Sequence, residues 1–92
     1  PMDRSALIRL AGFLAEQSVQ VLQITTGGVE RTLAARSTDL PSELEALFAQ
    51  GGSLTAPSLD LVIRCEPQAT NIAWQSSDQA VTMQVAKALA PA

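Results

Sequence analysis

The chain has no histidine and no tyrosine, and its single cysteine is Cys65. Histidine is the commonest general base and a common ligand of transition metals, so its absence excludes a Ser-His-Asp triad, a Cys-His pair and most zinc sites within one chain. One cysteine excludes an internal disulfide and gives no sign of an oxidising compartment. We therefore expect no catalytic residues, no metal and no cofactor, and a protein that is not an enzyme.

Charged side chains are also scarce, at 16% of the residues against about 25% in typical soluble domains. The net charge is −3 and the six basic residues are scattered, which argues against binding to nucleic acid or to an anionic membrane. No apolar run approaches the ~18 residues that span a bilayer, and no signal-peptide pattern is visible. These absences predict a cytoplasmic protein.

What the sequence does contain is aliphatic. Hydrophobic residues make up 47% and aromatic residues only 3%, so Leu, Val, Ile and Ala must build the core. The length of 92 residues predicts one compact domain, which we place at residues 2–92. We interpret Pro1, which precedes an initiator-like Met2, as a remnant of tag cleavage.

Helical periodicity predicts three helices, over residues 3–17, 39–50 and about 77–90. The first two have clear apolar faces at helical spacing: Leu7, Leu10, Ala11 and Leu14, then Leu40, Leu44, Leu47 and Phe48. In the third, Val81, Val85, Ala88 and Leu89 share a face. Candidate caps are Asp3 or Ser5 for the first helix, Asp39 or a Ser42–Glu45 capping box for the second, and a Ser76–Gln79 capping box for the third.

Two hairpins are predicted between these helices. Residues 18–36 form a hairpin that turns at Gly27-Gly28. In its first arm Val19 and Val21 fall on one side and Leu22 and Ile24 on the other, and a bulge near Val21-Leu22 would reconcile them. Residues 51–58 read as a loop that follows the Gly51-Gly52 helix stop. Residues 59–66 alternate, with Leu59, Leu61, Ile63 and Cys65 on one side, and a further strand covers about 70–76.

The fold class that follows is α+β, with about four antiparallel strands, three helices in the order αββαββα, and the helices mainly on one face of the sheet. A ferredoxin-like sheet is one topology consistent with this order. The order is also similar to that of small α+β modules used as bacterial secretion chaperones and GTPase-regulating adaptors, a resemblance of element order alone.

Two conspicuous residues are interpreted as core. Cys65 needs a cationic or basic neighbour to become reactive, and Arg64 would point to the opposite face of the strand. Trp74 would pack beside Ile72. Thr25 to Gly28 read as a hairpin turn and not as an anion-binding loop, because no helix follows them.

The polar face of the second hairpin is the candidate interface. It joins residues of the two predicted strands: Asp60, Val62, Arg64, Glu66, Asn71, Ala73 and Gln75. Val62 and Ala73 interrupt its polarity, and an apolar centre with an arginine is common in interfaces. Changing Val62 to Asp should leave the fold intact and abolish binding there.

We predict a non-enzymatic protein–protein interaction module, such as an adaptor, inhibitor, chaperone or assembly factor, that binds through this weakly charged sheet face and forms a homodimer. Its protein partner is not identified by the sequence. The alternative is a small ligand-binding or catalytic subunit whose site forms between chains from Asp60, Arg64 and Glu66. A third hypothesis is a structural component of a larger assembly.

Overall fold

The computed structural model describes residues 3–17 and 21–91, which form three α-helices, five strands and two 3-10 turns. The helices are α1 (Arg4–Glu16), α2 (Leu40–Gln50) and α3 (Gln79–Leu89). The strands are β1 (Val21–Thr26), β2 (Val29–Ala34), β3 (Gly52–Ala56), β4 (Leu61–Cys65) and β5 (Ile72–Ser76). The 3-10 turns are η1 (Pro57–Leu59) and η2 (Pro67–Ala69).

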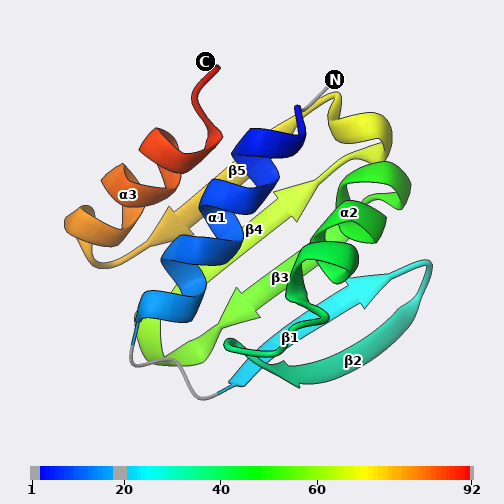
Figure 1. Ribbon diagram of the computed structural model, residues 1–92, viewed down its shortest axis with the longest axis horizontal. Helices are drawn as coiled ribbons and strands as arrows, with labels where there is room; N and C mark the ends of the chain where they lie inside the picture. The colour runs from blue at the N-terminus through cyan, green and yellow to red at the C-terminus, as the bar shows by residue number, and fades with distance from the viewer. Residues whose placement is uncertain (1–2, 18–20, 92) are drawn as a thin grey trace.

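The five strands form one sheet in the order β2-β1-β3-β4-β5, and every neighbouring pair is antiparallel. In the described part of the chain, α1, α2 and α3 all lie over the same face of this sheet (Figure 1). The predicted α+β class with three helices is confirmed. The predicted four strands and the order αββαββα are wrong, because the order is αββαβββα.

The additional strand is β3, which the sequence analysis read as part of a loop over residues 51–58. β3 inserts between β1 and β4, with Leu54 opposite Ile24 on one side and Ile63 on the other. Its sequence, GSLTA, has few apolar residues and is bounded by Gly51 and Pro57, so it resembles a turn. Because β3 occupies the centre of the sheet, the ferredoxin-like arrangement is not formed.

The β1–β2 hairpin is regular. Its register runs without interruption from Val21 opposite Ala34 to Thr26 opposite Val29, so the bulge predicted near Val21-Leu22 is wrong. Val19, whose spacing from Leu22 and Ile24 suggested the bulge, lies outside the described residues. Gly27 and Gly28 form the turn with positive φ angles of 56° and 77°, as a tight hairpin requires.

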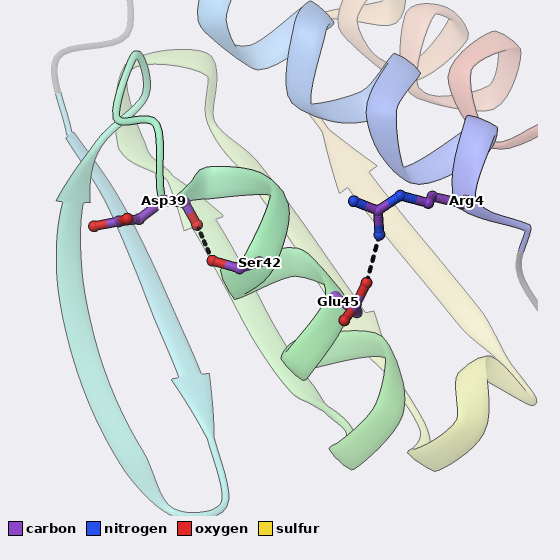
Figure 2. A network of polar contacts seen from close by, with 4 residues as sticks. All are labelled: Arg4, Asp39, Ser42 and Glu45. Atoms are coloured by element: carbon purple, nitrogen blue, oxygen red, sulfur yellow. Dashed lines mark hydrogen bonds and ion pairs between the residues drawn. The ribbon is translucent and has the colours of Figure 1, made fainter.

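Neither of the two predicted capping boxes is formed, although Asp39 stands at the N-cap position of α2, without a side-chain capping bond. Asp3 caps α1 as predicted, accepting a hydrogen bond from the Ala6 N–H. At α2, Ser42 donates its hydroxyl to the backbone oxygen of Asp39, and Glu45 pairs with Arg4 of α1 at 2.7 Å (Figure 2). The Ser42–Glu45 capping box is therefore wrong.

At α3, Asp78 caps the helix by accepting from the Ala80 N–H at 2.9 Å. The Ser76 hydroxyl donates to the Leu59 oxygen at 2.7 Å and accepts from the Asp78 N–H. Ser76 therefore joins β5 to η1, and the Ser76–Gln79 capping box is wrong.

The core lies between the sheet and the helix layer and is aliphatic, as the composition predicted. Its largest fully buried side chains come from all three helices and from β1, β3 and β4: Leu10, Leu14, Leu22, Ile24, Leu40, Leu44, Leu47, Leu54, Leu61, Ile63 and Val85. Phe48 is the one aromatic side chain in the buried set of the described residues. Burying each such side chain contributes roughly 1.5–3 kcal/mol before the entropy of ordering it is subtracted.

Candidate protein-interaction surfaces

Three helices cover one face of the sheet, and no helix of the described residues covers the other face. We call this second surface the open face. It is formed by alternate strand residues: Val21, Gln23, Thr25, Glu30, Thr32, Ala34, Ser53, Thr55, Val62, Arg64, Ala73 and Gln75. Each of these described residues is exposed or half-buried, whereas Leu22, Leu54 and Ile63 on the opposite face are fully buried.

Six of the seven predicted interface residues come together on the open face and its continuation. Val62 lies opposite Gln75, and Arg64 lies opposite Ala73. The ladder continues past the strand ends, where the Glu66 N–H donates to the Asn71 oxygen at 2.9 Å. The three pairs stand side by side along β4 and β5.

Asp60 is the residue that does not join them. It ends η1 in the left-handed region, with φ 46°, immediately before β4. Glu66 follows the other end of the same strand. At about 3.3 Å per strand residue, Asp60 and Glu66 are roughly 20 Å apart. The acids and the arginine of the alternative hypothesis therefore do not form one cluster within a single chain.

The open face extends well beyond the predicted hairpin. Thr25, Ser53 and Glu30 continue the row of Arg64 and Ala73 across β3, β1 and β2. The sequence analysis missed this half because strand order does not follow from local alternation. Among the described strand residues of the open face, Glu30 and Arg64 carry the charges, and they lie in the same row three strands apart.

Cys65 has the environment of a core residue, as predicted. Its side chain is 6% exposed and faces the helix layer. The thiol donates to the Glu66 backbone oxygen at 3.3 Å, and burial raises the pKa of Cys65 above its ordinary value. A raised pKa reduces the thiolate fraction at neutral pH, so the geometry does not favour a nucleophile.

Polar groups inside the protein are paired. Thr26 is the one buried polar residue in the described part. Its hydroxyl accepts from the Arg31 guanidinium at 2.9 Å, and the same guanidinium lies 2.7 Å from Glu43 of α2. Arg31 thus ties edge strand β2 to the helix layer.

Two further observations concern chemistry and membranes. Within residues 3–17 and 21–91, no group of three or more His, Cys, Asp or Glu side chains is placed to hold a metal ion. No helix in that part of the chain is both long and apolar enough to cross a bilayer.

A groove lies beside β5, the strand at one edge of the sheet. It has a volume of about 410 Å³ and runs between β5, the segment before it and the C-terminal half of α3. Its lining is mostly apolar: Ala69, Thr70, Asn71, Ile72, Trp74, Ala86, Leu89, Ala90 and Pro91. Trp74 packs against the core beside Ile72, as predicted, but both side chains stay half-buried because they also line this groove.

Comparisons with protein-family models, with curated proteins and with solved structures each found no match to this chain.

Proposed function

We propose that this protein is a non-enzymatic protein–protein interaction module and that its open face is the contact surface, bound in the first instance by a second copy of the chain. The observation that carries the proposal is the open face itself: a five-stranded sheet with one face uncovered by helices and only Glu30 and Arg64 charged among its described strand residues. Such a surface loses little on desolvation.

The size of the face is compatible with a modest interface. The molecule measures 29 × 28 Å across the broad view that shows the sheet and 23 Å in depth (Figure 1). That outline limits the footprint to roughly 800 Å² per partner, the size typical of specific complexes. Because the open face fills only part of the outline and is rich in Thr and Gln, we expect a weak, reversible dimer.

The two charges support a second copy as the partner. Rotation by 180° about an axis parallel to the strands, midway between β1 and β3, places β2 of one copy over β4 of the other. Glu30 and Arg64 lie in the same cross-strand row, so this rotation sets each Glu30 over the partner's Arg64, twice. Face-to-face sheets pack about 10 Å apart, which these two long side chains bridge from both sides.

The direct test is the concentration dependence of the sedimentation coefficient. Val62→Asp places an unpaired carboxylate on the open face, at its β4 side, and should weaken self-association by about tenfold or more. Met83→Asp is the matched control, because Met83 is 64% exposed on α3, outside the open face. Both variants should keep the wild-type circular dichroism spectrum.

A charge exchange tests the geometry. Glu30→Arg and Arg64→Glu should each weaken the dimer, because each brings like charges together. The two substitutions combined should restore it. A wild-type protein that stays monomeric at high concentration contradicts the second copy as partner, and a folded Val62→Asp variant that associates like wild type contradicts the open face as the surface.

A further inference from the structure

Among the described strands, β5 ends the sheet and has β4 as its single neighbour. The direction of its backbone groups follows from the hydrogen bond between the Glu66 N–H and the Asn71 oxygen. In an antiparallel ladder, hydrogen-bonded and non-hydrogen-bonded pairs alternate. Ala73 and Gln75 therefore direct their N–H and C=O groups toward β4, and Ile72 and Trp74 direct theirs outward from the sheet.

This edge lacks the usual protection against strand pairing. The sequence of β5, IAWQS, contains neither a charged residue nor a proline, the two side-chain devices that most often block an exposed edge. The opposite edge strand, β2, carries Glu30 and Arg31. Within the described residues, α3 approaches the C-terminal end of β5 through Thr82, whose hydroxyl lies 3.5 Å from the Ser76 oxygen and 3.4 Å from the Asp78 oxygen.

Ile72 and Trp74, whose backbone groups point outward, also line the groove described above. On the side of the sheet that faces the helices, the side chains of β4, such as Leu61 and Ile63, are fully buried, whereas the side chains of β5 are only half-buried. The helix layer therefore leaves part of the apolar surface of β5 uncovered, where the groove lies between the strand and α3. The Trp74 indole N–H donates to the Thr82 oxygen at 3.1 Å, which fixes the ring against α3.

We propose that the edge of β5 and this groove bind an extended segment of a partner protein, which adds to the sheet as a sixth strand. The outward groups of Ile72 and Trp74 supply two donors and two acceptors that match an extended backbone. Side chains at every second position of the segment enter the groove beside Trp74. Because no charged side chain lines the groove, these alternate side chains are apolar.

A second copy of this chain fits the site less well than a separate segment. Antiparallel pairing of β5 with its own copy, centred on Trp74, would use the outward oxygen of Ser76, which the Thr82 hydroxyl approaches to 3.5 Å. A short extended segment avoids that end of the strand. The site is independent of the open face, because it uses the edge of the sheet and the helix side of β5.

The probe is a displayed library of random heptapeptides, selected on the whole protein. We expect enrichment of sequences with apolar residues at alternate positions. Selection on Ala86→Glu should give no such enrichment, because Ala86 is exposed on α3 and lines the groove. Ala80→Glu is the matched control: Ala80 is also exposed on α3 but lies outside this groove, so the enrichment should persist.

The strongest selected peptide is then synthesised and titrated. Trp74 is the only tryptophan of the chain, so its fluorescence reports the groove directly and should shift to shorter wavelength, with saturation. Ala86→Glu should raise the dissociation constant of the peptide at least about tenfold. Two peptides N-methylated at alternate amides, one at the odd and one at the even positions, should differ: the set that faces β5 should weaken binding to the same extent, and the other set should not.

Three results would overturn the proposal. One is the absence of peptides enriched on wild type over Ala86→Glu. A second is binding that is indifferent to N-methylation in both phases, since strand addition depends on the backbone. The third is a Trp74 emission shift that follows protein concentration without peptide and disappears in Ala86→Glu, which would assign the edge to a second copy.

Discussion

Gly52 lies so close to Thr25 that a Cβ atom on Gly52 would stand 1.9 Å from the Thr25 backbone oxygen. The two residues belong to neighbouring strands, β3 and β1, at the end where β3 enters the sheet. Gly52 also has a φ of 142°, in a region that other residues rarely adopt. The absence of a side chain at this position is therefore what allows β3 to follow α2 directly and still pair with β1.

We predict that Gly52→Ala destabilises the protein by about 2–4 kcal/mol, because the added methyl group forces the backbones of β1 and β3 apart. Gly12→Ala is the control. Gly12 is exposed within α1, and its Cβ would meet nothing within 4 Å, so this change should stabilise by about 0.5–1 kcal/mol. Urea unfolding followed by circular dichroism measures both. Equal effects of the two substitutions would show that the close contact is not required.

The same glycine explains why sequence reasoning found four of the five strands. In β4 the buried Leu61, Ile63 and Cys65 alternate with a half-buried and an exposed position, and this alternation predicts a half-buried strand. β3 offers only Leu54 and Ala56 as buried positions, after two glycines that also fit a helix stop and a loop. Close packing of two backbones leaves no local signature besides the glycine itself.

The candidate surface was likewise predicted where it is local and missed where it is not. Alternation within β4 and β5 places Val62, Arg64, Ala73 and Gln75 on one face, and the structure agrees. The contribution of Glu30 depends on β1 lying next to β3, which no neighbouring residue pattern specifies. The groove beside β5 depends on how far α3 covers an edge strand, a feature of packing and not of sequence periodicity.

Arg9 connects the middle of α1 to the end of α3. Its Nε donates to the Ala88 oxygen at 2.9 Å, and a terminal nitrogen donates to the Ala90 oxygen at 2.7 Å. Both acceptors lie at the C-terminal end of α3, where the last carbonyl groups lack partners within the helix and favour a positive charge. Arg9 therefore performs the role of a C-terminal cap from a distant part of the chain.

We predict that Arg9→Ala lowers the free energy of unfolding by about 1–2 kcal/mol, since two charge-assisted hydrogen bonds are lost. Arg4→Ala is the control, because the Arg4–Glu45 pair is exposed, at 69% and 63% of the two side chains; its cost should stay below about 0.5 kcal/mol. Amide hydrogen exchange should locate the Arg9 effect in the last turn of α3. Uniform loss of protection across the chain would contradict a local capping role.

Asp3 and Asp39 stand at the N-cap positions of α1 and α2. Of these two residues, Asp3 makes a side-chain capping bond and Asp39 does not. The Ala6 N–H donates to the Asp3 carboxylate at 2.7 Å, and the Ser5 hydroxyl donates to it at 3.2 Å. The Ala6 hydrogen bond, with a smaller contribution from Ser5, lowers the pKa of Asp3 below its ordinary value of 3.8. The folded state therefore holds the ionised carboxylate more favourably than the unfolded state does.

The sign of the pH dependence follows from this lowered pKa. The stabilising contribution of Asp3 is fully present above about pH 3.8, and it is lost as the pH falls through the lower pKa of the folded state. We predict that Asp3→Ala is less stable than wild type at neutral pH and that the difference shrinks on acidification through that window. Thermal unfolding of wild type and Asp3→Ala from pH 7 to pH 2 measures the difference in stability. The other carboxyl groups are the same in both proteins, so their contributions cancel in this difference. Asp39→Ala, which removes no side-chain capping bond, should show no comparable narrowing. A wild-type advantage over Asp3→Ala that stays constant down to the lowest pH would contradict stabilisation by the ionised cap.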